Sequence, residues 1–202
     1  MKKTFFTLLV VISISEVFAE STFRFRALQA SPLLSDSSEK GKFKAGNTEI
    51  QLETPPGTYK SIMISVDSIG FGTSSITTRF NYAGSHYSLQ SNWLDAAIII
   101  GGPGNTSLTF GGGTTSSGKG TISNSSSDFT SNSIRGISWF GVLGLEYVLP
   151  LNLGFTGLNF TEVLLGYRQN RLDYKEFKNG SVLDQTLHID SAQYQFGIGF
   201  VF

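Results

Sequence analysis

The chain ends with the stretch Ala192-Gln193-Tyr194-Gln195-Phe196-Gly197-Ile198-Gly199-Phe200-Val201-Phe202, in which large apolar residues alternate with small or polar ones. A period of two indicates a β-strand, because successive side chains of a strand point to opposite faces. The solvent face of a soluble sheet normally carries charge, whereas the second face here carries only amides, glycines and a valine. The pattern is therefore not typical of a strand from a soluble sandwich.

These residues resemble the last strand of bacterial outer-membrane β-barrels, and the resemblance is closest to small barrels of the OmpA/OmpX kind. In such barrels the assembly machinery recognises a pattern on the last strand. The pattern is a polar residue, a glycine two positions later, and two hydrophobic residues at the end. The matching positions here are Gln195, Gly197, Phe200 and Phe202. The resemblance implies a barrel-assembly signal at these four residues, with the barrel-assembly machinery as a partner.

The first nineteen residues are typical of a secretory signal peptide. Lys2 and Lys3 form a positive start, and residues 5–12 form an apolar run that is too short to span a bilayer. Small residues before Glu20 predict cleavage after Ala19. We therefore expect export, with residues 20–202 forming one barrel in the outer membrane of a Gram-negative envelope.

Composition excludes several classes of protein. Fifteen Lys and Arg residues balance fifteen Asp and Glu residues, which argues against a nucleic-acid-binding protein. Only 15% of the residues are charged, against about 25% in a typical soluble domain. The chain has no Cys, which excludes disulfides and thiolate metal sites. We expect no cofactor and no metal, a monomer, and contact with outer-membrane lipid and lipopolysaccharide.

The turn signal Asn179-Gly180 predicts a hairpin between the last two strands. Pairing from this turn brings the apolar faces of both strands together, with Tyr167 opposite Ala192, Leu165 opposite Tyr194, and Val163 opposite Phe196. A slip of one residue would separate these faces, so the agreement supports the pairing.

Upstream, alternation and turn signals predict strands over residues 22–30, 59–69, 73–83, 86–100, 105–112 and 134–149. Thr48–Thr54 is a ninth candidate, but bacterial single-chain barrels have even strand counts. We therefore assign this segment to a long first extracellular loop, residues 31–58. The fold class predicted is all-β, an eight-stranded antiparallel up-and-down transmembrane β-barrel.

Residues 111–133 are predicted to form a second long extracellular loop. Nineteen of these 23 residues are Gly, Ser, Thr or Asn, a composition that indicates a flexible segment. Short turns near residues 71, 103 and 152 then lie on the opposite, periplasmic side. Long loops outside and short turns inside are typical of outer-membrane barrels.

The turn at Gly84-Ser85 predicts a register in which Tyr82 faces Tyr87, Phe80 faces Leu89, and Ile76 faces Trp93, all on the outer surface. This register directs Asp95 at lipid near mid-bilayer, which is energetically costly. A bulge between Trp93 and Ala97 would remove that cost. Aromatic residues that could form the interfacial girdles are Tyr59, Tyr82, Tyr87, Trp93, Trp139, Tyr147, Tyr167 and Tyr194.

The predicted faces place a set of charged residues inside the barrel: Arg24, Arg26, Asp67, Arg79, Glu146, Glu162 and Arg168. An eight-stranded barrel is just wide enough for side chains to fill it. A packed, ion-paired plug is the favoured interpretation, and a narrow passive, porin-like channel is the alternative. Conductance in planar bilayers distinguishes the two.

The sequence has two histidines, and each is a candidate for chemistry. His86 and Ser88 have a spacing similar to that in outer-membrane lipid A deacylases, and such a pair could act as base and nucleophile. The neighbouring residues do not otherwise match that family, and no third catalytic member is assignable. His188 and Asp190 are expected to be polar residues of the extracellular rim, because two ligands do not make a metal site.

The function that follows from the sequence is an integral outer-membrane protein with a structural or surface-interaction role. It would not be an enzyme, and its loops would be exposed outside the cell, where they could meet an extracellular ligand of unknown kind. The narrow channel is one alternative function. A lipid A-modifying hydrolase that uses His86 and Ser88 is the other.

Overall fold

The computed structural model describes residues 21–30, 39–45, 48–54, 57–102, 104–148, 160–179, 181–182 and 185–202. The predicted signal peptide and the predicted turn near residue 152 lie outside these residues. Within the described residues, no helix is long and apolar enough to cross a membrane.

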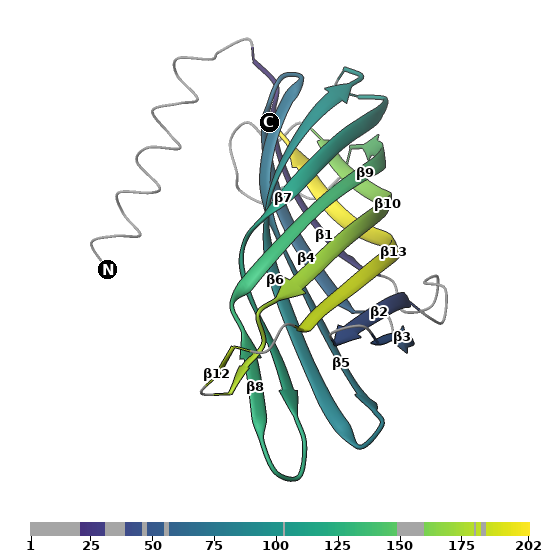
Figure 1. Ribbon diagram of the computed structural model, residues 1–202. Coiled ribbons are helices and arrows are strands. Elements are labelled where there is room, and N and C mark those ends of the chain that lie inside the picture. The colour runs from purple at the N-terminus through teal and green to yellow at the C-terminus, as the bar shows by residue number, and fades with distance from the viewer. Residues whose placement is uncertain are drawn as a thin grey trace, which may run out of the picture.

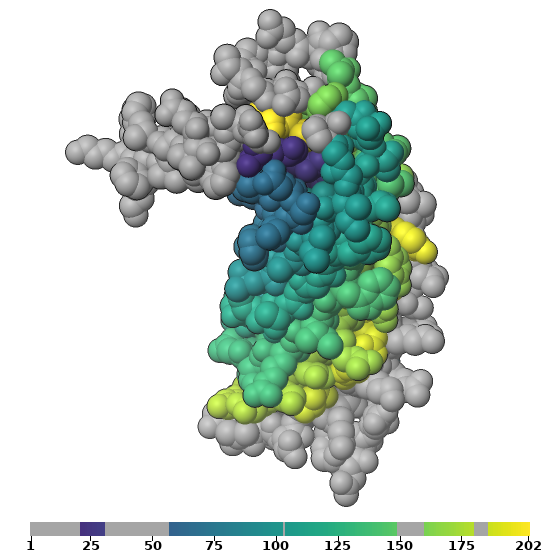
Figure 2. All heavy atoms as spheres, turned by 90° about the horizontal axis from the view of Figure 1, so that it is seen from above, coloured from purple at the N-terminus to yellow at the C-terminus, as the bar shows by residue number. Residues whose placement is uncertain are grey.

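Eight antiparallel strands close into a barrel (Figure 1). They are β1 (Phe23–Ala30), β4 (Thr58–Val66), β5 (Ile69–Tyr82), β6 (Ser85–Ile100), β7 (Thr106–Ser123), β9 (Ser133–Tyr147), β10 (Phe160–Lys175) and β13 (Gln185–Val201). The ring closes where β1 pairs with β13, for example Arg24 with Val201. Figure 2 shows this closure as the purple first strand beside the yellow last strand. The eight-stranded antiparallel barrel predicted from the sequence is confirmed.

Five shorter strands lie toward the other end of the barrel from the C-terminus (Figure 1). They are β2 (Glu39–Ala45), β3 (Thr48–Thr54), β8 (Asp128–Ser131), β11 (Lys178–Asn179) and β12 (Ser181–Val182). β2 pairs with residues 185–190 of β13, and β3 pairs with β2. The segment Thr48–Thr54 is therefore a strand outside the barrel ring, and the 31–58 connection carries a hairpin. We call this end the distal end, and the end where β1 begins and β13 finishes the terminal end.

The prediction of a flexible loop over residues 111–133 is wrong. β7 continues to Ser123 and returns through β8, so only a short turn at 124–127 separates them. Glycines serve close packing in this strand. A Cβ on Gly111 would collide with the ring of Phe140, and one on Gly113 would collide with the carboxylate of Asp95. Thr residues in the same segment favour strands.

Two predicted registers differ from the structure by two residues. Tyr167 pairs with Tyr194 rather than Ala192, because the connection between β10 and β13 is not a simple two-residue hairpin turn. There Lys178 pairs with Val182 and with Thr130 of β8. On the β5–β6 hairpin, Phe80 pairs with Tyr87, and the turn residues Ala83 and Gly84 have φ angles of 49° and 76°. Positive φ at both positions is typical of a type I′ hairpin turn.

The faces predicted for the distal part of β5 and β6 are inverted. Ile76, Phe80, Tyr87, Leu89 and Trp93 are buried inside the barrel rather than exposed outside it. Asp95 consequently points inward, and β6 needs no bulge. The irregularity lies on β7 instead, where Asn92 pairs with Ser117 and Trp93 with Thr115, leaving Ser116 as the extra residue.

The wall thus changes polarity along its length. Toward the terminal end the outer surface carries an apolar belt: Ile62, Ile64, Ile69, Phe71, Leu94, Ile98, Ile100, Leu108, Phe110, Ile137, Trp139, Leu145, Tyr147, Val163, Leu165, Tyr194, Phe196 and Ile198. Toward the distal end the large apolar side chains lie inside, in a distal core: Ile76, Phe80, Tyr87, Leu89, Ile122, Leu172, Tyr174, Phe177, Leu187 and Ile189. Exposed residues at that level include Arg79, His86, Gln90 and Lys119.

Candidate functional site

Near the terminal end the barrel interior holds a buried pair of Arg26 and Glu162. Arg26 lies on the inward face of β1, and Glu162 on the inward face of β10. The guanidinium donates from Nε to Oε2 at 2.6 Å and from Nη2 to Oε1 at 2.5 Å. It also donates to the hydroxyls of Thr109 at 2.5 Å and Ser107 at 2.8 Å. Both charges are therefore fully paired, as burial of charge requires.

Arg24 joins this pair to the turns of the terminal end. Its Nη2 lies 3.3 Å from Oε1 of Glu146, and its Nε lies 3.7 Å from Oε1 of Glu162. The other oxygen of Glu146 accepts from the backbone N–H of Gly104 at 2.6 Å. The carboxylate thereby fixes the β6–β7 connection to the interior of the barrel at its terminal end.

A second pair lies farther toward the distal end. Arg168 of β10 donates to both oxygens of Asp95 on β6, each at 2.9 Å. Asp95 Oδ2 also accepts from the hydroxyl of Ser74 at 2.7 Å. The remaining N–H groups of Arg168 donate to Asn170 at 2.7 Å, Ser138 at 2.7 Å and Tyr59 at 3.3 Å. Its guanidinium lies 5.2–5.3 Å from the ring centroids of Tyr59, Trp93 and Phe140, within cation–π range.

Sequence reasoning placed seven charged residues inside the barrel, and the structure brings five of them there: Arg24, Arg26, Glu146, Glu162 and Arg168. Arg79 is a correction, because it is exposed on the outer face of the inverted β5 segment. Asp67 is also a correction. It lies in the exposed β4–β5 turn with φ of 52°, where its side chain accepts from the N–H of Thr22 at 2.9 Å. Asp95 was missed, although an inward Arg168 signals the need for a buried carboxylate.

The interior forms a packed plug. Three arginines face three carboxylates in the two clusters, so their formal charges cancel. A cavity of about 10 Å³ lies between the clusters, lined among others by Arg26, Met63 and Asp95. That is room for about one water molecule. On the distal side of Arg168 the interior is filled by the distal core.

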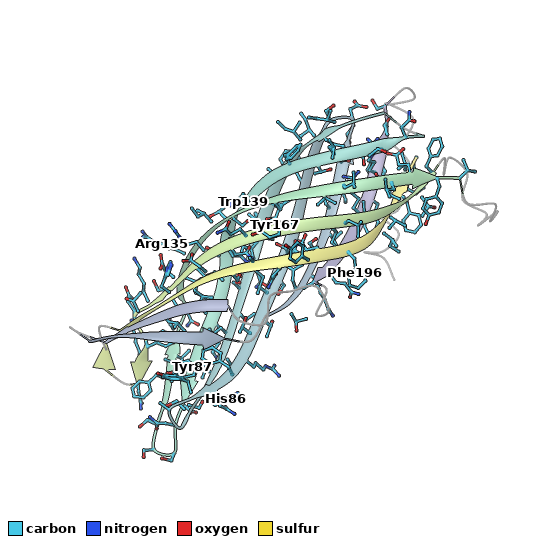
Figure 3. All side chains as sticks on the ribbon, turned by 90° about the vertical axis from the view of Figure 1, so that its right-hand side faces the viewer. His86, Tyr87, Arg135, Trp139, Tyr167 and Phe196 are labelled. Atoms are coloured by element: carbon cyan, nitrogen blue, oxygen red, sulfur yellow. The ribbon has the colours of Figure 1, made fainter. Side chains whose placement is uncertain are left out.

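His86 and Ser88 lie on the outer face of β6 close to the distal hairpin turn (Figure 3). The Nδ1 of His86 lies 2.8 Å from Oδ1 of Asn81, its cross-strand neighbour. Among the described residues no carboxylate contacts this imidazole. An amide cannot stabilise an imidazolium as a carboxylate does, so the structure does not assemble the orienting group that a base–nucleophile pair needs.

His188 lies on the outer face of β13 between two carboxylates. Its Nδ1 is 2.6 Å from Asp173 and its Nε2 is 3.1 Å from Asp190, which also pairs with Arg171 at 3.2 Å. Partial burial alone would lower the pKa of His188. The hydrogen bonds to Asp173 and Asp190 and their negative charges outweigh burial and raise the pKa above the usual 6.5.

We expect the imidazole of His188 to titrate above pH 6.5 in the folded protein. Because the folded pKa is raised, the charged histidine stabilises the fold fully below the unfolded pKa, and this contribution is lost as the pH rises through the folded pKa. The measurement is an NMR titration of the His188 ring in detergent micelles. Asp173→Asn should move its pKa downward, and an unchanged pKa in that variant would contradict the assignment.

Aromatic residues form a contact row on the outer surface of β9, β10 and β13 (Figure 3). The ring centroids of Trp139 and Tyr167 are 5.4 Å apart, and those of Tyr167 and Tyr194 are also 5.4 Å apart. Of the predicted girdle residues, these three and Tyr147 face outward. Tyr59, Tyr87 and Trp93 are buried inside, and Tyr82 packs against the distal core.

The four residues of the predicted assembly signal lie on β13 or at its end. Gln195 is buried inside the barrel. A Cβ on Gly197 would collide with the backbone of Ala27, so this glycine permits the close approach of β1. Phe202 contacts Phe23 with ring centroids 6.0 Å apart, next to the strand closure.

No protein-family model and no curated protein sequence matches the chain. Among solved structures, it is similar to Neisserial surface protein A, with 13% identity, 89% of this chain and 97% of that chain covered, and a TM-score of 0.48. It is also similar to Ail of Yersinia pestis in complex with the heparin analogue sucrose octasulfate (12% identity, 91% and 99% covered, TM-score 0.42). A third is the outer membrane protein OprG from Pseudomonas aeruginosa (12% identity, 90% and 95% covered, TM-score 0.43).

Proposed function

We propose that the protein is an integral outer-membrane β-barrel that anchors an interaction surface outside the cell. The observation that carries the proposal is the apolar belt around a charged interior. Exposed positions such as Ile98 (61%) and Phe71 (66%) lie outside, while Arg26 and Glu162 are almost completely buried. A soluble domain reverses this arrangement, and a closed barrel leaves no unpaired strand edge in the bilayer.

The direction of insertion follows from the ends of the barrel. Both termini of the ring lie at the terminal end, where β4–β5 is joined by the short turn at 67–68. The distal end carries the long β5–β6 and β7–β8 hairpins and the β2–β3 hairpin. In outer-membrane barrels the periplasmic connections stay close to the barrel, whereas the extracellular ones are longer and project from it, as these hairpins do. We therefore assign the distal end to the outside.

The plug supports an anchor rather than a channel. Every N–H of the Arg168 guanidinium has a partner, and the distal core closes the interior beyond it. A conducting path would need a continuous water-filled lumen, as in the wider barrels of porins. The distal hairpins, stiffened by their own internal apolar packing, are the surface offered to a partner.

The first test is heat-modifiability of the protein in isolated outer membranes. We expect it in the outer-membrane fraction, migrating differently in SDS before and after boiling, because a closed barrel stays folded until it is heated. In planar bilayers the same preparation should give only rare, small openings. A soluble periplasmic protein without a heat shift would contradict the proposal. A steady conductance would contradict the packed plug and support the channel.

A further inference from the structure

The apolar belt has a gap at Gly141 of β9. Outward residues before and after it on the strand are large: Ile137, Trp139, Leu143, Leu145 and Tyr147. A Cβ added at Gly141 would meet no atom nearer than 3.9 Å, so packing of the wall does not require glycine there. By contrast, a Cβ on Gly144 would collide with Ser107. Glycine weakens a strand, and it often marks a bulge, a tight bend or a place where a ligand approaches closely. The register of β9 against β7 and β10 is regular at Gly141, so no bulge accounts for this glycine.

The missing side chain leaves a hollow of about 320 Å³ on the lipid-facing surface. Its outward lining comes from three neighbouring strands: Leu108 and Phe110 of β7, Leu143 of β9, and Leu165 and Tyr167 of β10. The hollow is an open depression of the surface rather than an enclosed pocket, so a ligand seated in it would stay exposed on its outer side. The outward lining is apolar except for the tyrosine hydroxyl. The hollow therefore fits a hydrocarbon chain.

Beyond the hollow, toward the distal end, lie the aromatic row and then Arg135 (Figure 3). Six residues of strand separate Gly141 from Arg135, about 20 Å along the strand and about 14 Å along a barrel axis at 45° tilt. Arg135 is exposed and has no ion pair or hydrogen bond with any described residue. Asp173 lies opposite it in register, but its carboxylate is taken by His188. Among the described residues Arg135 is therefore a cation without a charge partner, and it lies above the hollow by about half the thickness of the hydrocarbon core.

We propose that the hollow at Gly141 holds one acyl chain of a phosphorylated glycolipid of the lipid A type, with a phosphate at Arg135. The proposal rests on the outer-membrane placement, because it puts Arg135 at the level of the outer-leaflet head groups. Exposed Gln169, the cross-strand neighbour of Trp139, adds an amide able to hydrogen-bond to sugar hydroxyls between the two points.

Native mass spectrometry of the protein extracted from the outer membrane in mild detergent tests this site, with hexa-acylated, bisphosphorylated lipid A as the probe. Gly141→Leu fills the hollow and should weaken binding about tenfold, as overpacking does. Arg135→Gln removes the cation and should weaken binding about fivefold. The effect of Arg135→Gln should vanish when the probe is dephosphorylated lipid A.

Matched controls make comparable substitutions at other exposed positions on the outer surface of the barrel. Ala96→Leu adds nearly as much bulk, three carbons instead of four, to an exposed position of β6, and Arg79→Gln removes an exposed cation from β5. Both variants should bind as the parent does. Unchanged binding in Gly141→Leu or Arg135→Gln would overturn the proposal, and so would equal binding of phosphatidylglycerol by the parent. Every variant is first shown to give the heat shift, so failure of the lipid site is distinguished from failure of the barrel assignment.

Discussion

Replacing Arg168 with methionine is expected to lower the free energy of unfolding by about 3–5 kcal/mol. The change leaves the carboxylate of Asp95 in the interior with the hydroxyl of Ser74 as its one side-chain hydrogen-bond partner among the described residues, after the loss of two hydrogen bonds of 2.9 Å. It also removes the cation that three aromatic rings surround. Urea unfolding in phospholipid vesicles, followed by tryptophan fluorescence, gives the measurement.

Two further variants separate the buried charge from general damage. Arg171→Gln breaks the exposed pair of Arg171 and Asp190, whose side chains are 64% and 43% exposed, and should cost less than about 1 kcal/mol. The double variant Arg168→Met with Asp95→Leu removes both charges and should regain most of the loss, because no charge is then left unpaired. A single variant as stable as the parent would show that the pair does not hold β6 to β10.

Sequence reasoning succeeded where alternation and environment agree. On β9 the alternation placed Trp139, Leu143 and Leu145 on one face and Phe140 and Val142 on the other, as the structure has them. On β1 it placed Arg24 and Arg26 inside. On β1 the charged residues share one face, and on β9 Gly144 and Glu146 share the face of Phe140 and Val142, so period and composition indicate the same inward face.

The same reasoning failed on the distal part of β5 and β6. Period two shows that Tyr87, Leu89 and Trp93 share a face, but it does not show which face looks inward. In a membrane barrel, large apolar residues are expected on the lipid face, whereas beyond the belt the structure buries them inside the barrel. Asp95 indicates the correct orientation, because it shares the face of Trp93 and a charge at mid-bilayer is costly. Turning that face inward brings Asp95 to Arg168 without any bulge in β6.

The 111–133 segment failed for a different reason. Its glycines and hydroxyl residues indicate disorder only if nothing packs against them. In the closed barrel, Gly111 makes room for Phe140, and Gly120 lies against Tyr174 and Phe177. These partners are distant in sequence. The local sequence pattern therefore cannot show which residues pack against these glycines, although the Thr residues between the glycines favour a strand.

The position of the membrane is tested by adding one charge at two heights on the same strand face. Leu165 lies at the centre of the outward row that joins Leu143, Leu165 and Phe196 across β9, β10 and β13. Leu165→Arg should lower the free energy of unfolding in vesicles by about 2–4 kcal/mol, the cost of an arginine at mid-bilayer.

Gln169→Arg is the matched control, because Gln169 is an exposed polar residue on the same face of β10, two residues beyond Tyr167 and beside Trp139 near the distal margin of the apolar belt. Its cost should be about 0–1 kcal/mol, as at a membrane interface. The difference between the variants measures the change from hydrocarbon to water along one strand. Equal tolerance of both arginines would mean that the belt does not face lipid, since only a low-dielectric surrounding penalises one height and not the other. A large loss of stability in both variants would mean that the hydrocarbon core reaches past the aromatic row. The distal core would then begin inside the bilayer instead of beyond it.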